Sequence, residues 1–272
     1  MKIQHNIKAL NSHKSLRTNN NLEKKNLEKL ASGYRINRAA DDAAGLNISE
    51  EMRAQVTGLD QAFDNAQDGI SLVRTMEGAM EEAHCMLNRM VELSVQAAHG
   101  IYSEENRGSI QEEVDQLRDE MQRIEDTTKF NGIALFKGGE SLTLQISESS
   151  EASGQLKVEL PDLSAANLGI KDISVETAEQ AREALSKIEW AVDYVSQARG
   201  KVGAYYNRLE CTSNNLNEMS SNISASESRI RDVNMAKEEM RRVKNDIFGE
   251  SAQAMLAQAN QVPEGILPLL QQ

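Results

Sequence analysis

The 272-residue sequence is poor in the residues that fill a compact core and in the residue that most strongly breaks helices. Aromatic residues make up only 4% of it, and it contains three prolines. A globular core of this size would usually contain more large aromatic side chains, whereas a thin helical bundle buries only a stripe on each helix. Because Pro161, Pro263 and Pro268 all lie in the second half of the chain, the first half lacks the strongest helix breaker. The composition therefore predicts long helices.

Cysteine and continuous apolar sequence are also scarce. The two cysteines, Cys85 and Cys211, are too few for a disulfide framework. No run of about 18 apolar residues occurs, so we predict no membrane insertion. The first six residues lead into polar sequence without an apolar stretch, and we expect no secretory signal peptide. If the protein lies outside the cell, we expect it to leave by another export route.

The sequence contains none of the common catalytic or cofactor-binding patterns. Phosphate-binding loops and the patterns GxGxxG, HExxH and GxSxG are all absent. His84 and Cys85 are adjacent, which is not metal-ligand spacing, because neighbours on a helix point about 100° apart. Asp41 and Asp42 could form a carboxylate pair, but a charge cluster at a helix start explains them better. We predict no enzymatic activity, no cofactor and no metal site.

Charge is unevenly distributed along the chain. The formal net charge is -12, yet residues 1–40 hold nine Lys or Arg and only two acidic residues, Glu23 and Glu28. A basic arm on an acidic body can bind nucleic acid or a membrane surface. No aromatic residue precedes Tyr34, so base stacking is disfavoured. Pairing with acidic surfaces of sister copies explains the arm at least as well, and we predict no nucleic-acid partner.

Apolar residues recur every three or four positions in three long segments, as in a coiled coil. The first segment covers residues 43–98, and the second covers 104–128 after a break at 99–103. The third begins near Thr177, which, like Ser103, is a typical helix N-cap. Its seam is the most regular in the chain: Ile188, Ala191, Val195, Ala198, Val202, Tyr205, Leu209, Thr212, Leu216, Met219, Ile223, Ser226, Ile230 and Val233.

The apolar spacing changes to every second residue between about 140 and 161. Leu142, Leu144 and Ile146 alternate with polar residues, and so do Leu156, Val158 and Leu160. A polar loop separates the two runs, and Pro161 ends the second. This pattern predicts a small β-hairpin.

The two tails, residues 1–42 and 235–272, are amphipathic but sparse in apolar residues, so neither is expected to fold alone. We expect them to pair with each other or with other copies, and to be mobile in a free subunit until polymerisation orders them. Their main apolar positions are Ile3, Ile7, Leu10, Leu16, Leu22, Leu27 and Leu30, and Met240, Val243, Ile247, Met255, Leu256, Leu267, Leu269 and Leu270. The predicted fold is all-α, an elongated long-helix bundle or coiled coil over residues 43–234 with a small β-hairpin in its middle segment.

If the chain ends lie together, the first and third long helices are antiparallel, with Ala44 near Ile230. Cys211 would then lie near residue 63, and Cys85 would be about 33 Å away along the axis. A disulfide needs Cα atoms within about 7 Å. We therefore predict that both cysteines are free thiols.

Residue strings at both ends of the chain resemble bacterial flagellins. Residues 30–46 (LASGYRINRAADDAAGL) closely resemble the N-terminal flagellin signature, and residues 224–232 (SASESRIRD) and 255–261 (MLAQANQ) resemble the C-terminal motif. Shorter matches lie at residues 65–71, 77–79, 92–98 and 130–132. The resemblance covers about 1–136 and 180–272, with the motifs in the right order.

The resemblance implies a structural subunit of the flagellar filament, located outside the cell. The terminal helices, 1–42 and 235–272, would form the inner coiled-coil layer, and residues 43–234 the next layer. Only a short segment separates the second and third helices, so we expect no outer variable domains. The resemblance also implies export of the unfolded chain by the flagellar type III apparatus. Its expected partners are other copies of the chain, an export chaperone on the C-terminal tail, cap proteins and hook-junction proteins.

The resemblance further implies recognition by the animal Toll-like receptor for flagellin. Leu93 lies outside the seam of the first long helix, and Arg89, Leu93 and Gln96 share one stripe that we predict to be exposed. The matching patch of flagellins is the part that this receptor grips, and it would be buried between subunits in a filament. The predicted receptor-binding residues are Arg89, Glu92, Leu93, Gln96, Ile110 and Glu113.

Three alternatives compete with a flagellin. A hook–filament junction protein shares the terminal architecture, but the full DDAAG block at 41–45 and the LAQANQ string at 256–261 favour flagellin. An enzyme is a second possibility, because some flagellins carry a metallopeptidase insert; that would need an HExxH pattern and a longer middle segment. A generic coiled-coil scaffold would form an oligomer of fixed size, not an open-ended polymer.

Overall fold

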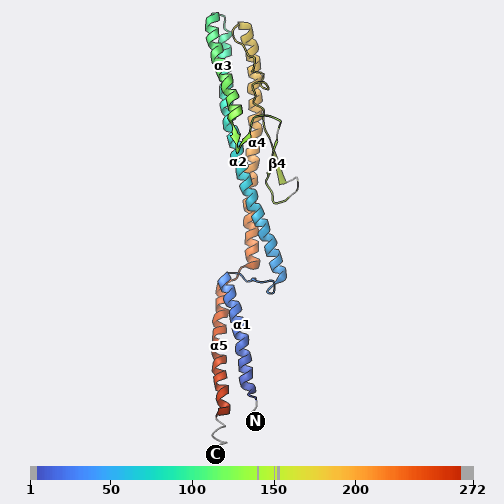
Figure 1. Cartoon of the computed structure of the whole chain (residues 1–272), viewed down its shortest axis with the longest axis vertical. Helices are drawn as coiled ribbons and strands as arrows, with labels where there is room; N and C mark the ends of the chain where they lie inside the picture. The colour runs from blue at the N-terminus through green and yellow to red at the C-terminus, as the bar shows by residue number, and fades with distance from the viewer. Residues whose placement is uncertain (1–4, 140, 150, 152–153, 265–272) are drawn as a thin grey trace, which may run out of the picture. The chain divides into compact units, whose positions relative to one another are not determined.

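The chain is mostly helical, with two small antiparallel sheets in its middle segment (Figure 1). The computed structural model describes residues 5–139, 141–149, 151 and 154–264. The helices are α1 (Ile7–Ser32), α2 (Ala43–Ala97), α3 (Glu104–Thr127), α4 (Ala178–Arg231) and α5 (Met235–Glu264). The strands are β1 (Lys129–Phe130), β2 (Ile133–Ala134), β3 (Ser141–Gln145) and β4 (Gln155–Glu159). The predicted fold class is confirmed, while the predicted apolar positions Ile3, Leu267, Leu269 and Leu270 lie outside the described residues.

The chain divides into two compact units. Unit 1 consists of Met1–Gln55 and Asn222–Gln272, and unit 2 of Val56–Ser221. Unit 1 contains α1, α5 and the adjoining ends of α2 and α4, whereas unit 2 contains the rest of those two helices, α3 and both sheets. How the chain maps onto the layers of a filament stays a prediction. Within the described ranges, no helix is both long enough and apolar enough to cross a membrane.

In unit 2, α2 and α4 run antiparallel in one register. Three side-chain hydrogen bonds join them: Gln67 donates to Ser213 (2.9 Å), Arg74 to Tyr206 (2.8 Å) and Ser220 to Asp60 (2.7 Å). The residue numbers of each pair have the same sum, so the helices do not slip against each other over this length. Gly69 lies in this interface, where a Cβ would come within 3.3 Å of Leu209.

The antiparallel arrangement was predicted, but the predicted register was wrong. The Gln67–Ser213 pair places Cys211 level with Gly69 and not with residue 63. The prediction assumed that the chain ends lie level, but the connectors that join the terminal helices to α2 and α4 differ in length. Cys85 is then about 24 Å from Cys211 along the axis. Both cysteines are exposed free thiols, as predicted.

The predicted seams form the core of unit 2. The α2 seam is buried almost throughout from Leu59 to Ala97, and the α4 seam is buried or half-buried from Ile188 to Leu216. Each fully buried Val, Leu or Met side chain contributes about 1.5–3 kcal/mol of transfer free energy. Full burial ends at Leu216, because Met219 is 40% exposed and the later seam positions Ile223, Ser226 and Ile230 are only half-buried. The regular seam of α4 therefore continues beyond the part that is fully covered in a single subunit.

The reverse turn after α2 brings α3 back alongside it. Ser103 caps α3 by accepting a hydrogen bond from the backbone N–H of Asn106, as its sequence position predicted. Arg107 Nε then donates to the carbonyl oxygen of Ala97 (2.9 Å). This contact between the first turn of α3 and the last turn of α2 fixes the two helices as antiparallel neighbours, side by side in Figure 1.

The predicted hairpin is present as β3 and β4, which pair from Ser141 with Glu159 to Gln145 with Gln155. The chain that follows it, residues 161–177, was not predicted. It has no regular secondary structure, yet it buries a row of apolar side chains: Leu163, Ala165, Leu168, Ile170, Ile173 and Val175. We call residues 161–177 the strap, because it closes one side of the bundle.

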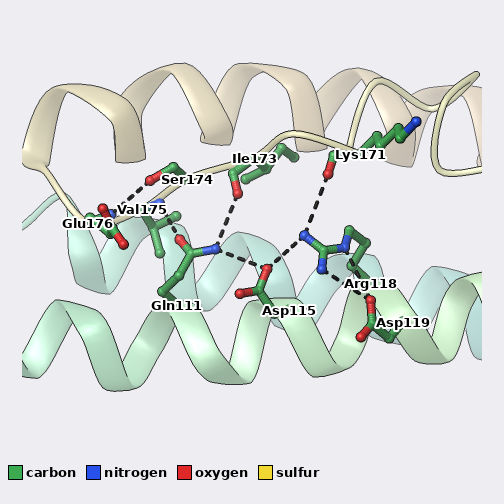
Figure 2. Close-up of polar contacts among 9 residues, drawn as sticks. All are labelled: Gln111, Asp115, Arg118, Asp119, Lys171, Ile173, Ser174, Val175 and Glu176. Atoms are coloured by element: carbon green, nitrogen blue, oxygen red, sulfur yellow. Dashed lines mark hydrogen bonds and ion pairs between the residues drawn. The ribbon is translucent and has the colours of Figure 1, made fainter.

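A glutamine of α3 holds the strap by its backbone (Figure 2). Gln111 Nε2 donates to the carbonyl oxygen of Ile173 (3.2 Å), and its Oε1 accepts from the N–H of Val175 (2.6 Å). Gln111 Nε2 also contacts Asp115, which in turn accepts from Arg118 Nη1 (2.7 Å). One side-chain amide thus provides hydrogen-bond partners for two part-buried backbone groups of the strap. Local sequence carries no signal for this long-range contact.

Near the end of α3, Glu125 is a buried acid, only 7% exposed. Burial raises the pKa of its carboxyl above the ordinary value, and the nearby Asp126 and Asp162 act in the same direction. The Gln122 side chain, which donates to Glu125 Oε2 (2.7 Å), and Lys137 oppose the increase. A charged Glu125 is therefore less favourable in the folded chain than in the unfolded chain.

We predict that Glu125→Gln stabilises the protein at pH 7. As pH rises above about 4.3, the ordinary pKa of Glu, the unfolded state ionises first, so stability is lost up to the raised folded pKa. The neutral amide keeps the hydrogen bond to Gln122 and removes this loss. Urea unfolding at pH 4 and pH 7 should show a higher midpoint for the variant at pH 7 and little difference at pH 4. An equal shift at both pH values would contradict the electrostatic explanation.

In unit 1, the connector between α1 and α2 (residues 33–42) pairs with the connector between α4 and α5 (residues 232–234). Gly33 ends α1 in the left-handed conformation (φ 75°), and its carbonyl oxygen accepts from the N–H of Val233 (2.9 Å). The N–H of Arg35 donates to the carbonyl oxygen of Arg231 (2.6 Å), whose guanidinium lies 4.7 Å from the centre of the Tyr34 ring. The two connectors thus hold each other in one subunit.

The paired acids before α2 have the helix-start role that the sequence favoured. Asp42 Oδ1 accepts from the N–H of Gly45 (2.9 Å), as an N-cap side chain does. Asp41 Oδ2 accepts from the N–H groups of Arg38 and Asn37, and these two hydrogen bonds lower the pKa of Asp41. Both carboxylates therefore accept hydrogen bonds from backbone N–H groups near the start of α2.

Candidate functional site

Three charged residues form an exposed ion cluster where α2 and α3 run side by side. Arg89 of α2 contacts Glu92 Oε2 (2.9 Å) on the next turn of its own helix and Glu113 Oε1 of α3 (2.8 Å). About half of the Arg89 side chain is exposed. The hydrogen bonds to Glu92 and then to Glu113 raise the pKa of Arg89 above its ordinary value. We call Arg89, Glu92 and Glu113 the Arg89 cluster; all three were predicted as receptor-binding residues.

The prediction that Leu93 is exposed was wrong. Leu93 is only 2% exposed and Ile110 only 8%. The Arg89–Glu113 and Ala97–Arg107 contacts set the register of α2 and α3, and in this register Leu93 lies level with Ile110. A single apolar seam accounts for one partner of α2, whereas α2 contacts both α3 and α4. Leu93 therefore belongs to the buried apolar layer between α2 and α3, one helical turn along α2 from Arg89.

Gln96 continues the exposed stripe towards the turn. Its Nε2 donates to Tyr102 Oη (3.3 Å), and the Tyr102 ring meets the His99 ring edge-on with centroids 6.3 Å apart. The structure thus places four of the six predicted residues, Arg89, Glu92, Gln96 and Glu113, on one polar surface. Sequence reasoning missed Tyr102, although an aromatic residue in a helix-to-helix turn is a detectable feature.

The terminal helices carry a different kind of surface. In unit 1, α1 and α5 lie side by side (Figure 1), and Asn19 Nδ2 donates to the carbonyl oxygen of Asn245 between them (2.7 Å). Ten of their larger apolar side chains are exposed in one subunit. These side chains, the outward apolar set, are Ile7, Leu10, Leu22 and Leu27 of α1, and Met235, Met240, Val243, Ile247, Phe248 and Met255 of α5.

The exposure of the outward apolar set is high. Ile7 is 63% exposed, Met240 67% and Met255 62%. Leu22, Phe248 and Met255 also line a groove between the two helices. Large apolar side chains exposed together on two paired helices indicate an interaction site. The sequence identified eight of the ten residues, but it missed Met235 and Phe248. Phe248 follows Ile247 directly and so falls off a single helical stripe.

Comparisons with known proteins identify the family to which the chain belongs. Residues 3–141 match the bacterial flagellin N-terminal helical region, and residues 185–270 match the bacterial flagellin C-terminal helical region. The chain belongs to the bacterial flagellin family. Its members are structural proteins, and the chain is a non-enzymatic subunit of the bacterial flagellar filament, outside the cell.

Relatives of similar length support this membership. The flagellin chain is 45% identical to a flagellin of Halalkalibacterium halodurans over 271 residues, which covers 99% of this chain and 100% of the relative. It is 44% identical over 305 residues to a flagellin of Bacillus subtilis, with 99% and 100% of the two chains covered. A flagellar filament core protein of Treponema phagedenis is 41% identical, with the same coverage.

Solved structures show the same kind of fold. The crystal structure of Bacillus cereus flagellin matches with a TM-score of 0.51 and 28% identity, over 60% of this chain and 94% of that chain. A putative flagellar hook-associated protein from Vibrio parahaemolyticus matches with a TM-score of 0.60 over 71% of this chain and 100% of that chain, at 12% identity. At 12% identity, the similarity to the hook-associated protein concerns the fold alone and does not indicate the same role. The family match favours flagellin over a junction protein.

Proposed function

We propose that the subunit polymerises through the outward apolar set of α1 and α5. The observation that carries this proposal is the exposure of ten large apolar side chains on two helices of one subunit. Burying them against neighbouring copies would contribute about 25 cal/mol for each Å² removed from water. The paired connectors hold the ends of α1 and α5 together, so both helices would enter the same contact.

Removing α5 tests this proposal. A chain that ends at residue 234 should stay soluble and helical but form no filaments, because six of the ten side chains of the outward apolar set are gone and α1 has lost its partner. Filament formation after salting out, observed by electron microscopy, is the measurement.

We also propose that the chain is exported unfolded by the flagellar type III apparatus, with a cytoplasmic chaperone covering the C-terminal tail. The apolar exposure of α5, with Phe248 at 54% and Met255 at 62%, supports this, because such a surface would polymerise or aggregate inside the cell. Cap and hook-junction proteins would receive the exported subunit. Secretion of the chain from cells that lack the apparatus would contradict this proposal.

A second proposal concerns the Arg89 cluster, which we propose as the contact for the host Toll-like receptor for flagellin. An arginine held in place by two carboxylates, with a buried apolar layer beneath it, is a pre-organised anchor for a protein partner. Gln96 and Tyr102 extend the same polar surface. In a filament this surface would be buried between subunits, so monomers should bind and intact filaments should not.

We predict that Arg89→Ala lowers the affinity for the receptor ectodomain by about tenfold or more, as expected for a central interface arginine. The matched control is Arg123→Ala, because Arg123 forms the same kind of exposed ion pair with Glu120 on α3 (2.5 Å). Binding of monomers would be measured by surface plasmon resonance, with circular dichroism to confirm the fold. Equal affinity of the Arg89 variant and the wild type would overturn the site.

A further inference from the structure

The contact between α1 and α5 is made mainly by polar and small residues. Buried and half-buried positions recur every three or four residues along both helices, as in a coiled coil. On α1 this seam contains Ser12, Leu16, Asn19, Glu23, Asn26 and Leu30. On α5 it contains Glu238, Arg242, Asn245, Gly249, Ala252 and Leu256. The ten side chains of the outward apolar set lie outside the seam, which contains only three leucines, so apolar burial alone does not explain why these helices pair in this way.

Asparagine side chains connect the two helices at successive levels. Asn6 Nδ2 donates to the carbonyl oxygen of Ala259 (2.7 Å), and Asn19 Nδ2 to that of Asn245 (2.7 Å). The side-chain amide of Asn26 can be oriented so that both its nitrogen and its oxygen have partners. In this orientation it donates to Glu238 Oε1 (3.0 Å) and accepts from Asn245 Nδ2 (2.9 Å). The three levels agree on one antiparallel register.

Two features make a shift of α1 against α5 out of this register energetically unfavourable. Glu238 is only 3% exposed, and besides Arg241 on its own helix (3.0 Å) its carboxylate depends on Asn26. Leaving a buried charge without its partners is strongly destabilising. Gly249 also makes room for Asn19, since a Cβ there would lie 3.1 Å from Asn19 Nδ2.

We infer that Asn19 and Asn26 are specificity-determining residues for assembly, which fix the antiparallel register of α1 against α5. A polar residue at a seam position sets register at some cost in stability, because a slipped pair leaves its amide unsatisfied. The seam repeats every seven residues, so without the asparagines a slip of one heptad would still align small and apolar positions. The register in turn sets how the outward apolar residues of α1 line up with those of α5. The inference rests on the proposed role of this helix pair in polymerisation.

The test is a distance measurement in the full chain. Exposed Lys8 of α1 and Lys237 of α5 are changed to cysteine and spin-labelled, after Cys85→Ser and Cys211→Ser remove the two exposed native thiols. Labelled subunits are diluted into unlabelled wild-type subunits and polymerised, and double electron–electron resonance gives the distance between the labels. A variant that does not polymerise is measured in solution.

With Asn19 and Asn26 in place, we expect a single distance. With Asn19→Leu and Asn26→Leu together, we expect a second component displaced by about 10 Å, the length of one heptad, because a slip by seven residues places the leucine introduced by Asn19→Leu opposite Ala252. The matched control is Asn20→Leu with Asn21→Leu, at exposed positions of the same helix, and should keep the single distance.

A single distance at the wild-type value in the Asn19/Asn26 variant, or a featureless spread without the displaced component, would overturn the inference. This outcome is distinct from failure of the proposed function. If the chain that ends at residue 234 still forms filaments, the polymerisation proposal fails, whereas the register is reported by the label distance itself.

Discussion

A chain that ends at residue 234 is expected to remain a soluble helical subunit and to form no filaments under conditions that polymerise the full chain. The physical reason is the distribution of apolar surface. Unit 2 buries its own seams, with Leu87, Val195 and Leu209 fully buried, so it does not need α5 to stay folded. The larger apolar residues of α1 and α5 are exposed in one subunit, and in our proposal neighbouring copies cover them. Sedimentation velocity, circular dichroism and electron microscopy would be compared for the two chains.

Point variants separate the loss of apolar surface from the loss of the helix. Met240→Asp with Ile247→Asp places two charges in the outward apolar set and should prevent polymerisation of the full chain. Gln253→Asp with Gln258→Asp adds the same charge at exposed polar positions of α5 and should leave polymerisation intact. If the truncated chain or the Met240/Ile247 variant still forms filaments, the terminal helices are not the polymerisation contact.

Leu93→Ala is expected to lower the free energy of unfolding by about 2–5 kcal/mol, the usual cost of deleting a buried leucine side chain. Leu93 is 2% exposed and level with Ile110, which is 8% exposed, so the change leaves a cavity between α2 and α3. The matched control is Val95→Ala on the same helix, because Val95 is 53% exposed and its truncation should change stability little. Urea unfolding followed by circular dichroism is the measurement.

The same variant also separates two roles for Leu93. The structure predicts that Leu93→Ala weakens receptor binding only by loosening the support of Glu113 and Arg89. Stability and affinity should then fall together, and hydrogen exchange should increase at the end of α2 and the start of α3. If Leu93→Ala binds poorly while its stability equals that of the wild type, Leu93 contacts the receptor directly, and the burial of this residue in the free subunit is not its bound state.

Several elements of the fold follow from local sequence patterns. The three- and four-residue spacing of apolar residues predicts α2, α3 and α4 to within about two residues of their ends, aided by the caps Ser103 and Thr177. Thr177 Oγ1 accepts from the N–H of Gln180 (3.3 Å). Alternation of apolar and polar residues predicts the β3–β4 hairpin. These features are local, because hydrogen bonds within a helix or hairpin join residues close in sequence.

The sequence also determined the class of function. The motifs at both ends identified a flagellin, and the sparse apolar residues of the tails predicted surfaces that need a partner. The resemblance to flagellins also indicated the residues of the Arg89 cluster, while helical spacing placed Arg89 and Gln96 on one stripe. The pairing of Arg89 with Glu113 required the family resemblance, since nothing in the spacing within α2 specifies which residue of α3 lies opposite.

Only the tertiary structure decided which face of each helix is covered, and by what. An apolar seam shows that a helix has a partner, but it does not show how many partners the helix has. Because α2 contacts a second helix, α3, the burial of Leu93 was missed. The register of α2 against α4 differed from prediction because it depends on the connectors and on contacts such as Gln67–Ser213. The strap and the asparagine contacts of α1 and α5 were likewise hidden, since polar side chains pair across the fold by geometry and leave no periodic signal in the sequence.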